Sequence, residues 1–232
     1  MKILHRLFLY IQDLYVSFNN LVSSEIVHNT EKHTAIKKSL FYKGIEGIGG
    51  DYLEFGVYEG TSLKGAATYW KKIAKNLPMR TGRMKFYGFD SFSGMKPEKG
   101  DEHPFYTSFD FSTDFKAIKK RFSKFPEVIL VPGFFQDTLK KTPQNYKINS
   151  AGIVMMDCDL YSSAKYAFNF LSKIVHRGTI FILDDYFNYL GGKKVGVRAA
   201  FEEFLNKNKI ECEEISKYGI GGVVFLVTNI KK

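Results

Sequence analysis

Two pairs of acidic residues follow short apolar runs in the second half of the chain. Asp157 and Asp159 are the first and third residues after the run 151–156, and Asp184 and Asp185 come directly after the run 179–183. If these runs are neighbouring strands of a parallel sheet, four carboxylates meet at one sheet edge, where like charges are costly unless a cation lies among them. All-oxygen ligands suit Mg²⁺, Mn²⁺ or Ca²⁺ better than zinc. We therefore predict a divalent-cation site, with helix caps that point to solvent as the alternative.

A second pattern of interest lies in the first half of the chain, where Glu54 is followed by Gly56 and Gly60. Glycine permits a tight turn from a strand into a helix, and the exposed amides at the helix start suit a carboxylate or a phosphate. The pattern has low specificity, and an ordinary tight turn explains it equally well.

The next two apolar runs also end in residues that suit a nucleoside. Asp90 follows the run 85–89 and is expected near a ribose diol, with helix capping as the alternative. Gly133 and Phe134 follow the run 128–131 and are expected near an adenine, although packing against the sheet explains the aromatic residues nearly as well.

The order of the predicted elements indicates an α/β fold. Apolar runs alternate with helical stretches, which is typical of a parallel sheet with crossover helices. The predicted strands are 51–57, 85–89, 128–131, 152–156 and 179–183, and the predicted helices are 62–76, 114–123, 163–175 and 195–206. The last two runs, 213–216 and 223–227, are joined by a link too short for a crossover, which favours a hairpin. Five parallel strands plus a C-terminal antiparallel hairpin, with helices on both faces, form the Rossmann-like sheet of a class I methyltransferase.

Residues 1–45 are predicted to form an N-terminal helical extension of a domain that covers residues 46–232. Apolar residues from Leu4 to Phe18 recur at helical spacing, and a second helix is expected over 31–42. Asn29 and Thr30 could cap its start, and Gly44 lies where a helix stop is expected. The extension is interpreted as a lid or packing element, with a partner subunit or a membrane surface as alternative contacts.

Composition narrows the class of protein further. The chain has 232 residues, which suits one domain, and its two cysteines, Cys158 and Cys212, form no CxxC pair. The net charge of +10 alone does not indicate nucleic-acid binding, because basic clusters are more often solvated faces. No run approaches the roughly 20 apolar residues of a membrane span. We expect a cytoplasmic protein without integral membrane association or a nucleic-acid partner.

Five sequence blocks in order resemble the macrocin O-methyltransferase (TylF-type) family over about residues 50–205. The blocks are EFGVYEGTS (54–62), FDSFSGM (89–95), GFFQDTL (133–139), DCDLYSS (157–163) and DDY (184–186). The resemblance implies an S-adenosylmethionine-dependent and Mg²⁺-dependent O-methyltransferase. Members of the family mostly methylate sugar hydroxyls of antibiotics and other glycosylated metabolites, so the implied partner is a small-molecule acceptor.

The resemblance also implies roles for individual residues. The metal ligands would be Asp157, Asp184 and Asp185, and Asp159 would be the general base. The cofactor would contact Glu54, Gly56, Tyr58, Gly60, Thr61, Ser62, Asp90, Ser91, Gly133 and Phe134, with the methionine end near residues 54–62, the ribose at Asp90 and the adenine near residues 133–134.

Some features depart from the family pattern and leave alternatives open. Cys158 replaces a glycine and is expected to be a small buried side chain, and Ser162 stands where glutamate is common. His103, in the long stretch 91–113, is an alternative base if that stretch covers the site.

Two competing functions stay open: a catechol-type O-methyltransferase and a non-catalytic protein with a cofactor fold. The expected assembly is a homodimer whose contact is the apolar stripe of residues 4–18.

Overall fold

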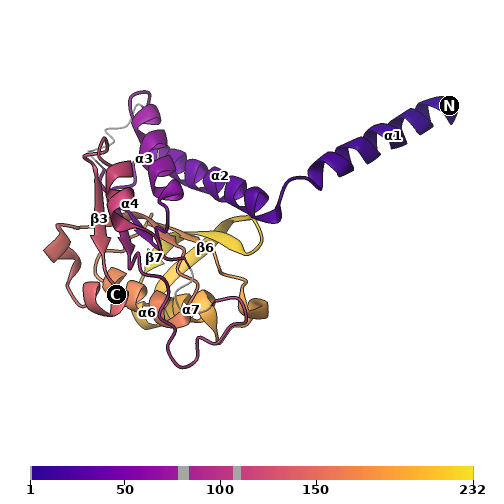
Figure 1. Cartoon of the computed structure of the whole chain (residues 1–232). Coiled ribbons are helices and arrows are strands. Elements are labelled where there is room, and N and C mark those ends of the chain that lie inside the picture. Colours follow the sequence, from indigo (N-terminus) through magenta and orange to yellow (C-terminus); the bar gives the residue numbers. More distant parts are fainter. Residues whose placement is uncertain (1, 78–83, 107–110, 232) are drawn as a thin grey trace.

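A single seven-stranded sheet forms the centre of the molecule (Figure 1). The computed structural model describes residues 2–77, 84–106 and 111–231. The strand order is β3-β2-β1-β4-β5-β7-β6, in which β1 to β5 are parallel and β7 is antiparallel to both of its neighbours. The strands are β1 (Asp51–Phe55), β2 (Phe86–Asp90), β3 (Val128–Pro132), β4 (Ala151–Met156), β5 (Ile180–Leu183), β6 (Ile210–Tyr218) and β7 (Gly222–Ile230). The five parallel strands and the C-terminal hairpin predicted from the sequence are confirmed.

The hairpin strands are longer than their apolar runs indicate. β6 has nine residues, but most of them are exposed or half-buried polar side chains, so only its pairing with β7 marks it as a strand. β6 is an edge strand with one face in water, so its side chains are not apolar on both faces.

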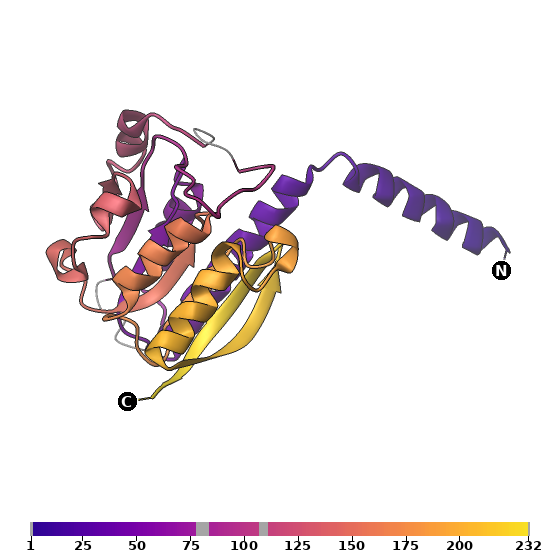
Figure 2. The same ribbon diagram turned by 90° about the horizontal axis from the view of Figure 1, so that it is seen from below.

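Helices cover both faces of the sheet, because strand side chains alternate between the two faces. One face is covered by α5 (Phe135–Thr138), α6 (Tyr161–Leu171) and α7 (Gly196–Asn208), and the other by α2 (Ser24–Ile45), α3 (Thr61–Ile73) and α4 (Phe115–Arg121). Figure 2 shows α6 and α7 side by side on their face. Two short 3₁₀ helices, η1 (Pro143–Tyr146) and η2 (Tyr189–Gly191), lie in connections.

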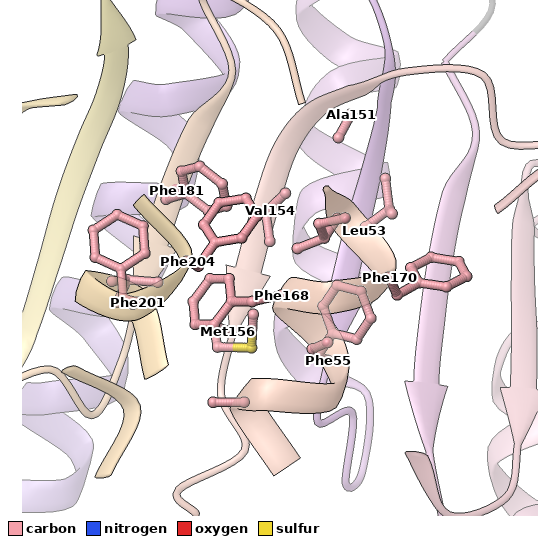
Figure 3. Close-up of a cluster of buried hydrophobic side chains, with 14 of the residues drawn as sticks. Leu53, Phe55, Ala151, Val154, Met156, Phe168, Phe170, Phe181, Phe201 and Phe204 are labelled. Carbon is pink, nitrogen blue, oxygen red and sulfur yellow. The ribbon is translucent and has the colours of Figure 1, made fainter. Parts of the chain in front are cut away.

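An aromatic cluster fixes α6 and α7 on the sheet (Figure 3). The rings of Phe168 and Phe204 stack with centroids 5.2 Å apart, and Phe181 of β5 meets Phe201 edge-on at the same centroid separation. All four side chains are buried. Burial of rings this large stabilises the fold by roughly 1.5–3 kcal/mol each. These ring contacts therefore fix α6 and α7 against β5.

Helix α2 begins earlier than the sequence predicts. The expected start at Glu31 is wrong, because the helix begins at Ser24 and the hydroxyl of Ser23 accepts a hydrogen bond from the backbone N–H of Ile26. Asn29 and Thr30 therefore lie inside the helix and do not cap it. The additional first turns contact the β6–β7 hairpin, which local sequence does not reveal.

The expected stop of α2 at Gly44 is also wrong. The helix continues to Ile45, and the left-handed residue that follows its end is Gly47. A Cβ on Gly44 would lie 2.2 Å from Cδ1 of Leu77, so the glycine allows close packing of that leucine against α2. Glycine occurs both at helix stops and where another group packs closely against the backbone, and the sequence alone does not show which of these two causes applies.

Helix α1 (Lys2–Asn19) extends away from the rest of the molecule (Figures 1 and 2). Its large apolar side chains from Leu4 to Phe18 are exposed. Over residues 2–77, 84–106 and 111–231, none of the helices combines the length and the apolar character needed to span a bilayer.

Candidate active site

A cavity of about 770 Å³ lies at the carboxyl ends of the five parallel strands, β1 to β5. Ligands of doubly wound sheets collect at this edge. The cavity walls include the turn after β1, the first half of α2 and parts of the segment 94–111. The residues at the ends of all five parallel strands therefore line one space.

The turn after β1 is built on Gly56. Its φ of 93° is unfavourable for other residues, and a Cβ at this position would lie 1.7 Å from the backbone oxygen of Asp157. The backbone N–H of Gly56 donates to the carbonyl of Phe89, and the N–H of Asp157 donates to the carbonyl of Phe55, both at 2.9 Å. The turn is thus held directly against the end of β4.

Asp90 holds the same turn from the side of β2. Its Oδ2 accepts the backbone N–H groups of Val57 and Tyr58 at 2.6 and 2.8 Å, and its Oδ1 accepts the N–H of Phe92 at 2.6 Å. Two carboxylate oxygens offer about four acceptor positions, so capacity for one further donor is left. Asp90 lines the cavity.

Glu54 lies behind the turn and is fully buried. Its carboxylate accepts hydrogen bonds from the hydroxyls of Tyr52 at 2.7 Å and Ser62 at 2.6 Å. Burial raises the pKa of Glu54 to about 7, although both hydrogen bonds act in the opposite direction. This carboxylate connects β1 to the first turn of α3.

Asp157, Asp184 and Asp185 form an acidic cluster at the ends of β4 and β5. One carboxylate oxygen from each residue lies within 4.8 Å of the others. Burial and the charge of Asp184 raise the pKa of Asp157. Burial and the charges of Asp159 and Asp184 raise the pKa of Asp185. The carboxyl groups of this cluster are therefore close enough to affect one another's ionisation.

Helix α2 and the hairpin supply partners to this acidic cluster. The Nζ of Lys32 lies 2.8 Å from Oδ2 of Asp157 and 2.7 Å from Oδ2 of Asp184. Asp184 Oδ2 also contacts Nε2 of His28 at 3.1 Å, and its Oδ1 accepts the hydroxyl of Tyr218 at 2.8 Å. Burial alone would raise the pKa of Asp184, but His28 and Lys32 outweigh it and lower the pKa to about 2.

The ring of His28 is held at both nitrogens. Its Nδ1 accepts the backbone N–H of Ile220 at 3.1 Å, so in the neutral ring Nε2 carries the proton and donates to Asp184. Glu31 accepts the N–H of Gly219 in the same hairpin turn. Sequence reasoning did not identify His28, Lys32 or Tyr218, because their elements meet the acidic cluster only in the folded chain.

Asp159 lies beside the acidic cluster with a left-handed backbone, at φ 59°. Its N–H donates to Oδ2 of Asp185 at 3.3 Å, and the hydroxyl of Tyr106 hydrogen-bonds to its side chain. Burial and the charge of Asp184 raise the pKa of Asp159 to about 6. Asn188 donates to both Asp185 and the hydroxyl of Tyr106, which links the segment 94–106 to the cluster.

The sequence-predicted site residues divide into two groups. The cavity is lined by Gly56, Tyr58, Asp90, Ser91, Phe134, Asp157, Asp159, Asp184 and Asp185. Outside the lining of this cavity lie Glu54, Gly60, Thr61, Ser62 and Gly133. In the second group, Glu54 belongs to β1, Gly60, Thr61 and Ser62 form the start of α3, and Gly133 follows β3.

The two residues that depart from the family pattern and the alternative base His103 are also placed. Cys158 is buried and lines the cavity. Ser162 is held by Asp101, which accepts both its backbone N–H and its hydroxyl. His103 lies outside the cavity, where its ring packs against Tyr106 and Tyr189. The suggested cover 91–113 includes residues 107–110, which lie outside the described residues.

The parallel sheet closed by an antiparallel hairpin, with a cavity at its strand ends, defines a class I methyltransferase fold. The family model of macrocin-O-methyltransferase (TylF) matches residues 32–225. The chain belongs to the macrocin O-methyltransferase family and is an S-adenosylmethionine-dependent O-methyltransferase.

Solved structures share this fold. The O-methyltransferase NovP is 24% identical with a TM-score of 0.65 over 85% of this chain and 79% of its own. CalS11, a calicheamicin methyltransferase, is 15% identical with a TM-score of 0.65 over 93% of this chain and 85% of its own. An O-methyltransferase from Bacillus cereus, solved in complex with SAH, is 14% identical with a TM-score of 0.55 over 84% and 81% of the two chains. Curated protein sequences give no significant match.

The donor set at the acidic cluster fits a hard divalent cation. Three carboxylates converge within 4.8 Å, and oxygen ligands are those that Mg²⁺ prefers. The other half of the cavity fits S-adenosylmethionine, because a glycine turn, a carboxylate and the ring of Phe134 follow three adjacent strands.

Proposed function

We propose that this protein is a Mg²⁺-dependent methyltransferase that methylates a hydroxyl of a sugar or of a glycosylated metabolite. One observation carries the proposal: the acidic cluster Asp157, Asp184 and Asp185 lines the same cavity as Asp159 and the Gly56 turn. An acceptor molecule bound in this cavity could therefore reach the base, the cation and the cofactor at the same time.

The cofactor and the cation, when bound, and the side chains of the protein would have different roles in methyl transfer. When bound, S-adenosylmethionine supplies a methyl group on a sulfonium, and Mg²⁺, held by Asp157, Asp184 and Asp185, lowers the pKa of a neighbouring hydroxyl. Asp159 would accept the hydroxyl proton and so leave an oxygen nucleophile for the methyl group that the cofactor would supply. Its raised pKa, about 6, suits a base near neutral pH. Tyr106 and Asn188 orient Asp159 and Asp185 for this role.

The proposed cofactor contacts follow from the two groups of site residues. Gly56, Tyr58, Asp90, Ser91 and Phe134 contact S-adenosylmethionine directly. Glu54, Gly60, Thr61 and Ser62 support the turn and the start of α3, and Gly133 shapes the turn after β3 next to Phe134. We also propose that residues 46–232 form the catalytic domain and that residues 1–45 extend it.

A sugar acceptor is supported by two observations. The name of one structure of CalS11, which is 16% identical with a TM-score of 0.57, describes a TDP-rhamnose 3'-O-methyltransferase. In this chain, the aromatic rings of Phe105, Tyr106 and Phe111 line the cavity, where they offer faces for sugar stacking.

The test is an acceptor panel with the full-length protein, S-adenosylmethionine and Mg²⁺. We expect mass spectrometry to show one added methyl group on TDP-rhamnose or a related nucleotide sugar. Methylation of 3,4-dihydroxybenzoate alone would favour the catechol-type reaction, and cofactor binding without any product would favour a non-catalytic protein. A cytoplasmic location and a dimer stay predictions.

A further inference from the structure

We infer that the ammonium group of Lys32 and the divalent cation compete for Asp157 and Asp184. This inference rests on the proposed function, because it requires the acidic cluster to bind a cation. It assigns α2 a part in the site: a lysine of this helix stabilises the cluster in the cation-free protein and leaves when the cation binds.

The first argument is the position of Lys32. Its Nζ bridges Oδ2 of Asp157 and Oδ2 of Asp184, at 2.8 and 2.7 Å. These residues are two of the three that converge as candidate cation ligands. A cation that joins the same two carboxylates would lie in the space next to the ammonium group, where two positive centres repel each other.

The second argument is the occupancy of Asp184. Its Oδ1 accepts the hydroxyl of Tyr218, and its Oδ2 contacts both Lys32 and His28. Three of about four acceptor positions are already used. Both acceptor positions of Oδ2 are used, so a cation can bind this oxygen only when Lys32 or His28 leaves it, and one position is left on Oδ1.

The third argument identifies Lys32 as the partner that leaves. Tyr218 belongs to a strand paired along its length with β7, and the ring of His28 is also held by Ile220. The ammonium group of Lys32 has only Asp157 and Asp184 as described hydrogen-bond partners, and it is carried on a flexible four-carbon stem. Its side chain is 11% exposed at the cavity wall, so a path to solvent exists.

The first experiment measures Mn²⁺ binding by electron paramagnetic resonance in full-length wild-type protein, Lys32→Met and Lys38→Met. Lys38 is an exposed lysine on the same helix and serves as the matched control. We expect Lys32→Met to bind Mn²⁺ about tenfold more tightly than wild type, and Lys38→Met to equal wild type. Equal or weaker binding by Lys32→Met would overturn the inference and leave the cation site standing. Absence of binding in all three proteins would overturn both the inference and the Mg²⁺ part of the proposed function.

The second experiment uses the wild-type protein, in case Lys32→Met does not fold. Lysine acetylation by an amine-reactive ester is followed by peptide mass spectrometry in EDTA and in saturating Mg²⁺. Competition predicts that Mg²⁺ increases the reactivity of Lys32 severalfold, while the reactivity of Lys38 is unchanged. Unchanged or decreased reactivity of Lys32 would contradict the inference.

Discussion

The backbone oxygen of Asp157 lies where a side chain on Gly56 would be, 1.7 Å from the position of a Cβ. The turn after β1, on the proposed cofactor side, and the end of β4, on the proposed cation side, are therefore in direct backbone contact. One rigid junction sets the distance between the two halves of the cavity.

Gly56→Ala should destabilise the protein by about 4 kcal/mol or more, because the new methyl group overlaps backbone and the φ of 93° is strained. Gly49→Ala is the control, since a Cβ there meets nothing within 4 Å, and it should change stability by less than about 1 kcal/mol. Urea unfolding of both variants checks the prediction. Similar midpoints for the two variants would show that the junction is not tight.

Asp90→Asn should weaken S-adenosylmethionine binding about tenfold to a hundredfold, because the amide cannot accept all three backbone N–H groups that shape the turn. Calorimetric titration measures the affinity. Asp114→Asn, which changes the cap of α4 in the same way, is the control. Equal affinities in the two variants would remove Asp90 from the cofactor site.

Glu54 should make stability fall as the pH rises. Its folded pKa, about 7, lies above the ordinary value of 4.5, so between these values the unfolded chain binds fewer protons than the folded chain. Glu54→Gln lacks this titration. Relative to wild type, its free energy of unfolding should gain about 2 kcal/mol between pH 5 and pH 8. A pH-independent difference in urea unfolding would mean that Glu54 is ionised throughout.

Asp159→Asn should lower kcat about 10²-fold to 10⁴-fold with little change in S-adenosylmethionine affinity, because it removes the proton acceptor and keeps the shape. Single-turnover kinetics and calorimetry separate the two effects. The exposed Asp137, on the short helix α5, supplies the control Asp137→Asn. Retention of wild-type kcat by Asp159→Asn would assign the base elsewhere.

The sequence was sufficient to predict the residues at the strand ends, because parallel strands must end at one sheet edge. Asp157 and Asp184 are 27 positions apart, yet the register of β4 on β5 brings them together. The contacts of His28 and Lys32, on α2, with Asp184 were not predicted, because a lysine in a polar stretch of sequence is usually exposed to solvent. One signal was present: Lys32 lies three, four and eight positions before Ala35, Ile36 and Leu40, the buried face of α2.

The same limit explains the errors at the ends of α2. Ser23 and Thr30 are both acceptable helix caps by residue type. The hydrogen bonds of His28 and Glu31 to the hairpin turn, 188 or more positions away, hold the first turns in the helix. The residue pattern around the helix start does not reveal contacts with residues so far away in the chain.

The most direct test of the central claim compares cofactor binding and turnover in the same protein with Mg²⁺ and with EDTA. We expect calorimetry to give the same S-adenosylmethionine affinity in both conditions, because the cofactor half is built without the acidic cluster. Methyl transfer to the sugar acceptor should occur with Mg²⁺ and stop in EDTA. Equal turnover in both conditions would contradict the account.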